Sequence, residues 1–254
     1  MFPIYENRSL KMTRFFVSEG ELGLNQAVLT GENLAHAKVL RLKAGEKLLL
    51  CDGAGMESLA TVREVGANEI LLDLEPPVPS ASEAAVQVSV YMAFSKGDKL
   101  EHVIQKATEL GAYEIVAFPG ARCVSRPDEK SLKKKLERWQ KIAASAAEQS
   151  GRGRIPQVVV CDSYAAALYR GAQADKALLF YENEQATTLK MALQSGPYRS
   201  VSLLTGPEGG LEEQEVAEAR KMGFAVCTLG KRILRCETAP LCALSAVMYD
   251  AGEF

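Results

Sequence analysis

A cluster of prolines divides this chain of 254 residues into two parts with different sequence patterns. Residues 75–83 read Glu-Pro-Pro-Val-Pro-Ser-Ala-Ser-Glu. Proline lacks the backbone NH that helices and sheets use, and the small residues between the prolines add little to a core, so this segment forbids helix and interrupts sheet pairing. We therefore predict two domains, residues 1–75 and residues 84–254.

The first part consists of short runs of strand-forming residues. Turn-forming residues at 43–45, 52–55 and 66–68 separate most of these runs, and such close spacing predicts a small β-barrel. The expected strands are residues 14–17, 26–29, 46–51, 58–62 and 69–74.

In the second part, apolar strands alternate with helices. The residues from Asp98 to Gly111 have the apolar spacing of a helix, with a cap-like aspartate at the start and a glycine at the end. A longer helix is expected after residue 128, with its lysines and arginines facing outward. Such alternation predicts an α/β fold whose mostly parallel sheet carries helices on both faces. The expected strands are residues 86–94, 113–118, 157–161, 176–181, 200–204 and 224–229.

The charge of the chain is unevenly distributed. The formal net charge is −2, but residues 122–154 contain ten basic and four acidic side chains, which gives +6 there and leaves −8 elsewhere. A solvated helix face is one explanation. The arginines that flank the run lie in expected loops, and they favour binding to a polyanion such as RNA.

Several classes of protein are excluded. The chain has neither a signal-peptide pattern at its start nor an apolar run of about eighteen residues, so we predict a cytoplasmic protein without membrane contact. Its six cysteines form no Cys-x-x-Cys pair and are expected to be reduced. Because there are only two histidines, neither of them near a cysteine pair, no metal site is expected.

Ligands of α/β proteins lie beyond the carboxyl ends of strands, where two loops stand out. The first is Thr205-Gly-Pro-Glu-Gly-Gly210, whose glycines either let backbone approach a flat ligand or simply make a tight turn. It contains no phosphate-binding motif, and acids at Glu208, Glu212 and Glu213 would repel phosphate. A neutral or cationic ligand is favoured, and a sulfonium cofactor fits that preference.

The second loop is Gly230-Lys-Arg-Ile-Leu-Arg-Cys-Glu-Thr-Ala-Pro240, and an apolar final helix follows it. Thr238 is expected to cap this helix and Pro240 to stand in its first turn. The charged residues Lys231, Arg232, Arg235 and Glu237 are explained either by a surface ion-pair loop or by a functional site.

Together, the two loops resemble motifs of the SPOUT methyltransferases, and specifically of the bacterial 16S ribosomal RNA uridine N3-methyltransferase family. The matching sequences are Leu203-Leu-Thr-Gly-Pro-Glu-Gly-Gly210 and Leu229-Gly-Lys-Arg-Ile-Leu-Arg-Cys-Glu-Thr-Ala239. Further motifs match in the same order along nearly the whole chain: Arg14-Phe-Phe-Val17, His36-Ala-Lys-Val-Leu-Arg41, the segment from Lys96 to Gly111, and Ala147-Glu-Gln-Ser-Gly-Arg152.

This resemblance implies a PUA-like RNA-binding barrel followed by a methyltransferase domain with a deep trefoil knot. Neither periodicity nor composition would have predicted a knot. It also implies a homodimer, with part of the interface on the final helix, and S-adenosylmethionine as the cofactor. The expected cofactor-binding residues are Tyr181, Glu182, Thr205, Gly206, Pro207, Glu208, Gly209, Gly210, Leu229, Gly230, Ile233, Leu234 and Thr238.

The implied reaction is methylation of N3 of a uridine in 16S ribosomal RNA, with free RNA or the small subunit as the partner. Arg235, or Arg14 of the partner subunit, is a candidate to stabilise the deprotonated base, while Glu208 or Glu237 accepts the proton or orients that arginine. The alternatives are a SPOUT enzyme that acts on a ribose 2'-hydroxyl or another base, and a non-catalytic RNA-binding module of ribosome assembly. The expected RNA contacts are Arg14, Arg41, Lys96, Arg122, Arg126, Arg152 and Arg154.

Overall fold

The computed structural model describes residues 12–124 and 127–254, which fold into two compact units. The first unit contains the described residues up to Glu83 together with Ala147–Ile155, and the second contains Ala84–Ala146 and Pro156–Phe254. The chain therefore passes between the units at the proline cluster and twice more near residue 150. The two later crossings have no proline cluster to mark them in the sequence.

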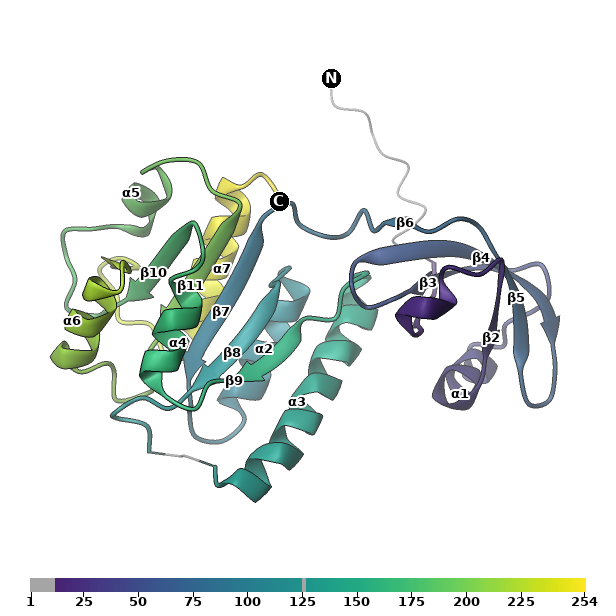
Figure 1. Cartoon of the computed structure of the whole chain (residues 1–254), viewed down its shortest axis with the longest axis horizontal. Helices are drawn as coiled ribbons and strands as arrows, with labels where there is room; N and C mark the ends of the chain where they lie inside the picture. The colour runs from purple at the N-terminus through teal and green to yellow at the C-terminus, as the bar shows by residue number, and fades with distance from the viewer. Residues whose placement is uncertain (1–11, 125–126) are drawn as a thin grey trace. The chain divides into compact units, whose positions relative to one another are not determined.

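The first unit is a six-stranded curled sheet, which is the form taken by the predicted barrel (Figure 1). Its strand order is β1-β3-β4-β5-β2, and β6 pairs with β4 beside this path. Only β1 and β3 run parallel; the other pairs of this sheet are antiparallel. Its core contains Phe15, Leu29, Leu48, Ile70 and Leu72. The elements are β1 (Arg14–Phe16), η2 (Glu19–Glu21), β2 (Gln26–Leu29), α1 (Gly31–Val39), β3 (Lys47–Cys51), β4 (Met56–Val65), β5 (Ile70–Leu74) and β6 (Val78–Pro79).

Three of these elements were not expected from the sequence: β6, α1 and the short 3-10 helix η2. Strand β6 lies inside the proline cluster, where sheet pairing was predicted to be interrupted; that prediction was wrong for Val78 and Pro79. A two-residue edge strand tolerates proline because its outer side needs no NH donor. Helix α1 buries only Leu34 and Ala37, so its sequence has little of the apolar spacing that indicates a helix.

Hydrogen bonds to Glu83 attach the segment Ala147–Ile155 to the rest of the first unit. Its carboxylate accepts hydrogen bonds from Nη2 of Arg152 at 2.6 Å and from the backbone NH groups of Gly153 at 2.9 Å and Arg154 at 3.0 Å. Gly153 also packs so closely on Ser80 that a Cβ atom there would overlap the serine side chain. The segment Ala147–Ile155 is thus an integral part of the first unit.

The second unit is the predicted α/β fold, with a six-stranded sheet in the order β12-β10-β11-β7-β8-β9. Every neighbouring pair is parallel, as the sequence indicated. The elements are β7 (Gln87–Ala93), α2 (Lys99–Glu109), β8 (Glu114–Phe118), α3 (Glu129–Ser150), β9 (Gln157–Val160), α4 (Tyr164–Gly171), β10 (Lys176–Phe180), α5 (Leu189–Leu193), β11 (Ser200–Thr205), α6 (Glu213–Lys221), β12 (Ala225–Cys227) and α7 (Thr238–Asp250).

Helices cover both faces of this sheet (Figure 1). Helices α4 and α6 pack on the face that carries Tyr91, Phe118, Leu179 and Leu204. Helix α7 lies on the other face, where it contacts α2 and the central strands β7 and β11. Because successive side chains of a strand point to opposite faces, a strand that is buried on both sides is mostly apolar, and β8 is buried at all five of its residues. Its one charged residue, Glu114, pairs with Arg170 at 2.6 Å.

The last two elements bring the chain back to the middle of the sheet. Strand β12 is at the edge, next to β10, whereas α7, which follows it, packs against β7 and β11 in the centre. The intervening residues therefore return across the carboxyl ends of β10 and β11. These strand ends are the place where an α/β sheet binds its ligands.

Candidate functional site

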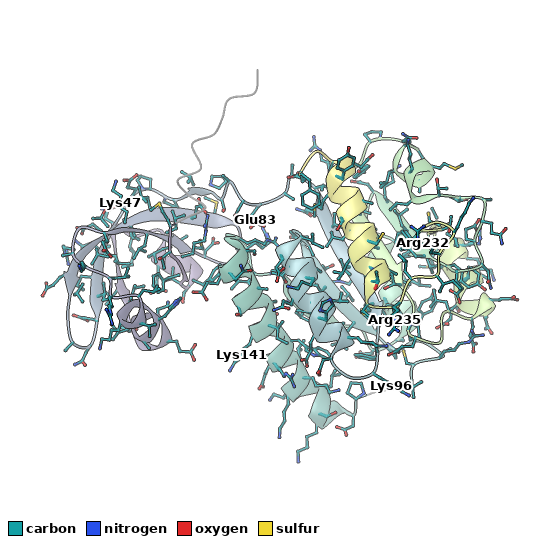
Figure 2. The ribbon with its side chains drawn as sticks, turned by 180° about the vertical axis from the view of Figure 1, so that it is seen from behind. Lys47, Glu83, Lys96, Lys141, Arg232 and Arg235 are labelled. Carbon is teal, nitrogen blue, oxygen red and sulfur yellow. The ribbon has the colours of Figure 1, made fainter. Side chains whose placement is uncertain are left out.

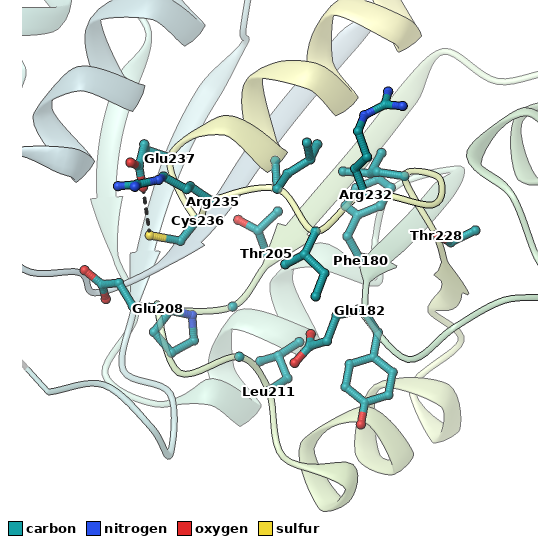
Figure 3. A pocket seen from close by; sticks show the side chains of 18 of the residues that line it. Phe180, Glu182, Thr205, Glu208, Leu211, Thr228, Arg232, Arg235, Cys236 and Glu237 are labelled. Carbon is teal, nitrogen blue, oxygen red and sulfur yellow. Dashed lines mark hydrogen bonds between the residues drawn. The ribbon is translucent and has the colours of Figure 1, made fainter.

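Three loops meet at the carboxyl edge of the sheet and enclose a pocket of about 540 Å³ (Figure 3). They follow β10 at Tyr181, β11 at Gly206 and β12 at Thr228. This volume lies within the usual range of small-molecule sites, roughly 300–1,000 Å³. The two loops that stood out in the sequence thus form opposite walls of one cavity.

Backbone hydrogen bonds join the first loop to the third. The NH of Tyr181 donates to the carbonyl of Cys227 at 3.1 Å, and the NH of Thr228 donates to the carbonyl of Thr187 at 2.8 Å. Within the third loop, the NH of Gly230 donates to Oγ1 of Thr228 at 3.1 Å. These contacts fix the backbone of the wall that carries Leu229.

The glycines of the second loop make a tight turn and also line the pocket. A Cβ atom at Gly206 would lie 2.9 Å from Cγ of Leu211, and one at Gly209 would lie 3.0 Å from Cβ of Arg122. Gly210 has a φ of +72°, and a Cβ there would overlap the carboxylate of Glu182. A side chain at any of these three positions would force a neighbouring group to move, and the glycines leave bare backbone facing the cavity.

The cradle of bare backbone suits a flat, uncharged ring, and Phe180 and Leu211 add apolar wall beside it. The other end of the pocket is charged. In Figure 3, Arg235, Cys236 and Glu237 lie there together with Glu208, while Glu182 and Thr228 lie toward the opposite end. An apolar cradle with nearby carboxylates fits a ligand that combines an aromatic ring with a positive charge, as S-adenosylmethionine does.

Lys99 is the cation at the centre of the charged end. Its Nζ lies 3.0 Å from Oε1 of Glu208, 3.8 Å from Oε2 of Glu237 and 3.9 Å from Sγ of Cys236. The hydrogen bond to Glu208 raises the pKa of the Lys99 ammonium group, which keeps it protonated at neutral pH.

Both carboxylates of this cluster are ionised at neutral pH. Partial burial raises the pKa of Glu208, but hydrogen bonds from backbone NH groups, including that of Lys96 at 2.9 Å, and from Lys99 outweigh it and lower the pKa overall. In Glu237, burial is outweighed by its own backbone NH, by the Cys236 thiol and by Lys99. The thiol of Cys236 has a pKa raised to about 12, chiefly by burial and by its hydrogen bond to Glu237.

The structure brings nearly all of the expected cofactor residues together. Thr238 is the exception: it is an exposed residue in the first turn of α7, and its NH donates to the carbonyl of Arg235 at 2.8 Å. The helix is preceded by Glu237 at the cap position, so the prediction of Thr238 as the cap was wrong. The expected residues that do line the pocket are Tyr181, Glu182, Thr205, Gly206, Pro207, Glu208, Gly209, Gly210, Leu229, Gly230, Ile233 and Leu234.

Six further lining residues were missed by the sequence analysis. Two of them adjoin residues that were named, since Phe180 ends β10 and Leu211 follows the glycine loop. Lys99 begins α2, just beyond the carboxyl end of β7, and inspecting the end of every strand would have found it. The missed residues are Lys99, Phe180, Leu211, Thr228, Cys236 and Ala239.

Of the expected catalytic residues, the pocket contains Arg235, Glu208 and Glu237, while Arg14 lies in the first unit. Arg14 is on β1, is only 4% exposed, and pairs with Glu57 at 3.6 Å. An enclosed guanidinium group of this kind would have to give up its carboxylate to reach an RNA or a partner's uridine. Arg14 is therefore a buried residue of the first unit.

The expected RNA-binding residues differ in their exposure to solvent. Lys96, Arg41 and Arg122 are exposed, and Arg122 lies next to the glycine loop, where it donates to the carbonyl of Gly209 at 3.1 Å. Arg152 is buried against Glu83, which makes it structural.

The remaining two are Arg154 and Arg126. Arg154 is half-buried beside Gly55. Arg126 lies outside the described residues. Lys96 and Arg235 are labelled in Figure 2.

No group of three or more His, Cys, Asp or Glu side chains suited to a metal ion occurs among the described residues. In the same part of the chain, no helix is both long and apolar enough to cross a membrane.

Comparisons with known proteins identify the family to which the chain belongs. Residues 82–248 match a family model described as an RNA methyltransferase domain, and residues 29–75 match one described as an RNA methyltransferase PUA domain. The chain is 37% identical to the ribosomal RNA small subunit methyltransferase E of Bacillus subtilis, over 94% of this chain and 97% of that protein.

Solved structures give the same result. The ribosomal RNA small subunit methyltransferase E of Neisseria gonorrhoeae, solved with S-adenosylmethionine bound, is 31% identical, with a TM-score of 0.81 over 94% of this chain and 97% of the other. A protein from Legionella pneumophila, also solved with S-adenosylmethionine, is 28% identical, with a TM-score of 0.79 over 94% and 98% of the two chains.

The fold, the pocket and the two matched domains define the class, an RNA methyltransferase with a PUA domain. Within that class, the chain belongs to the ribosomal RNA small subunit methyltransferase E family. The predictions of an RNA methyltransferase and of S-adenosylmethionine as its cofactor are confirmed.

Proposed function

We propose that this protein transfers a methyl group from S-adenosylmethionine to N3 of a uridine in 16S ribosomal RNA. The observation that carries the proposal is the pocket at the carboxyl edge of the sheet, where a cradle of glycine backbone meets a cluster of charged side chains in a chain of this family. S-Adenosylmethionine, when bound, supplies the activated methyl group. The residues of the chain must bind the cofactor, present the base and manage the proton of N3.

The glycine loop and the loop from Leu229 to Leu234 hold the cofactor in this proposal. Arg235 is exposed at the charged end, where its guanidinium group can stabilise negative charge on the uracil carbonyl oxygens as the N3 proton leaves. Glu208 and Glu237, both ionised, are placed either to accept that proton or to orient Arg235. Positioning of the base against the methyl donor supplies much of the acceleration.

The RNA contacts that we propose are the exposed cations around the pocket and on α3. Lys96 and Arg122 adjoin the glycine loop, and Lys134 and Lys141 are exposed on α3. Figure 2 labels Lys96 and Lys141. Arg41 and Arg154 belong to the first unit, whose PUA match favours an RNA-binding role. The target is a loop or an exposed nucleotide, because a duplex hides the base edge that must be methylated.

We also propose that the protein is cytoplasmic, since its substrate would be part of the small ribosomal subunit, and that it forms a homodimer. Helix α7 and the residues after it expose large apolar side chains, Tyr249 at 75% and Phe254 at 67%, which suit a contact between two copies. The return of the chain from β12 at the edge to α7 at the centre of the sheet favours the trefoil knot that the resemblance implies. A mass of twice 27.5 kDa in light scattering would support the dimer.

Product analysis tests the proposed reaction. The protein is incubated with labelled S-adenosylmethionine and small-subunit particles that lack the modification, and the RNA is then digested to nucleosides. We expect label in 3-methyluridine. Label in a ribose-methylated nucleoside or another base would instead indicate a different SPOUT specificity. Absence of any label, together with no binding of S-adenosylhomocysteine in calorimetry, would indicate a non-catalytic RNA-binding module.

A further inference from the structure

Lys99 stands where three segments of the second unit meet. It is the first residue of α2, and β7, which precedes this helix, is the central strand beside β11. Glu208 approaches it from the loop after β11, and Glu237 from the loop that precedes α7. One ammonium group therefore connects the two loops that form opposite walls of the pocket.

The contacts of Lys99 are those of a shared counterion. Its Nζ donates to Glu208 at 3.0 Å and lies 3.8 Å from the carboxylate of Glu237. The three side chains are 32%, 27% and 20% exposed, so the cluster is partly shielded from water. Two carboxylates that face one site repel each other, and a cation between them replaces that repulsion with attraction.

The other groups near Glu208 and Glu237 do not replace the positive charge of Lys99 between the two carboxylates. The NH of Lys96 binds Glu208 through the backbone at 2.9 Å, but it brings no full charge. Arg235 acts on Glu237 through its charge, yet its side chain is exposed. Cys236 donates its thiol hydrogen to Glu237 at 3.3 Å and stays neutral at ordinary pH.

We propose that Lys99 is a positioning residue for methyl transfer, which holds the carboxylates of Glu208 and Glu237 ionised and in place at the charged end of the pocket. This inference rests on the proposed function, because it assigns Lys99 a part in that reaction. Lys99 acts through the two glutamates and needs no contact with the base or the cofactor.

Loss of the Lys99 charge should change how the activity depends on pH. Removing the ammonium group takes away an attraction that lowers the pKa of both glutamates, so both pKa values rise. As the solution is acidified, the variant therefore loses the activity that needs ionised glutamates at a higher pH than the wild type does. At pH 8, where both stay ionised, the pocket without Lys99 is more negative and holds a sulfonium cation at least as well.

The test compares three variants. Lys99→Met removes the charge with little change in volume, and Lys99→Arg keeps the charge. Lys106→Met is the matched control, because Lys106 is on the same helix and pairs with Glu109 at 2.8 Å, outside the pocket. The measurements are kcat, KM for S-adenosylmethionine, the thermal midpoint, and the pH dependence of kcat from pH 9 down to the lowest pH at which the protein stays folded.

We expect Lys99→Met to lower kcat at pH 8 by roughly tenfold or more, which is the range for losing a charge-assisted hydrogen bond. Its KM for S-adenosylmethionine should not increase, and the acidic limb of its pH profile should move up by about one pH unit. Lys99→Arg should restore most of the activity and the wild-type acidic limb. Lys106→Met should behave like the wild type.

Three results would overturn the inference. The first is a Lys99→Met protein with the kcat and pH profile of Lys106→Met. The second is a loss of activity with an unmoved acidic limb and a higher KM, which a merely structural role would produce. The third is failure of Lys99→Arg to restore activity. Formation of 3-methyluridine by the wild type is measured alongside, so failure of the proposed function itself is recognised separately.

Discussion

The ion pair between Glu83 and Arg152 is predicted to be the main fastening of the segment Ala147–Ile155 to the first unit. The Arg152 side chain is 5% exposed, and the Glu83 carboxylate also accepts hydrogen bonds from two backbone NH groups. Glu83→Ala leaves a buried guanidinium group without this carboxylate. Breaking a buried pair from one side costs about 3–5 kcal/mol, and we expect about 3 kcal/mol because Glu83 is partly exposed.

That loss should be visible as a lower thermal midpoint. For domains of this size, each kcal/mol lowers the midpoint by roughly 2–4 °C, so Glu83→Ala should unfold about 6–12 °C earlier than the wild type. Amide hydrogen exchange should become faster within Ala147–Ile155. Glu109→Ala breaks the pair with Lys106, which is more exposed than the pair of Glu83 and Arg152. It should cost less than about 1 kcal/mol and serves as the control.

A double-mutant cycle separates the ion pair from other effects of the substitution. If the pair matters as described, Glu83→Ala combined with Arg152→Met should destabilise the protein less than the sum of the two single changes. Additive losses, or a Glu83→Ala protein no less stable than Glu109→Ala, would refute the reasoning.

Three further predictions follow from the structure. Gly210→Ala should weaken binding of S-adenosylhomocysteine in calorimetry by about tenfold, since a Cβ there displaces Glu182. Gly223→Ala is the control, because Gly223 also has a positive φ, +91°, but no neighbour within 4 Å; it should lower stability without changing affinity. Replacing Lys134 and Lys141 by Gln should reduce the slope of log affinity for RNA against log salt by about 0.7 per lost phosphate contact, and an unchanged slope would exclude α3 from the RNA surface. Glu184→Gln should lower the thermal midpoint at pH 7. Hydrogen bonds from backbone NH groups and from Arg220 lower the pKa of Glu184, so its stabilisation is complete above the ordinary glutamate pKa and is lost as the pH falls from there through the lowered pKa. The difference between Glu184→Gln and the wild type should therefore shrink as the solution is acidified, and a difference that does not change with pH would contradict this.

The sequence predicted the sheet of the second unit well because its signal is local. Most of each strand is a short apolar run, because a strand buried on both faces has few positions that tolerate a polar side chain. The sequence did not reveal that Ala147–Ile155 belongs with the first unit. That arrangement uses contacts between distant positions, such as the pair of Glu83 and Arg152, which are 69 positions apart, and no local pattern encodes such a distance.

The candidate site was predictable in its backbone and less so in its side chains. Both loops follow parallel strands, and their glycines and order matched a known family, so the pocket walls were expected. Lys99 was expected only as part of a helix start and of a family motif, and not as a site residue, because its partner Glu208 is 109 positions away. Arg14 and Arg152 were expected to bind RNA because a sequence shows charge but does not show burial.

The central claim is that the pocket between the glycine loop and the loop after β12 is the cofactor site. A crystal structure of the protein with S-adenosylhomocysteine tests it most directly. We predict ligand density inside this pocket, with the adenine ring against the backbone of Gly206 and Gly209. Density at any other place on the protein, with this pocket left unchanged, would contradict the account.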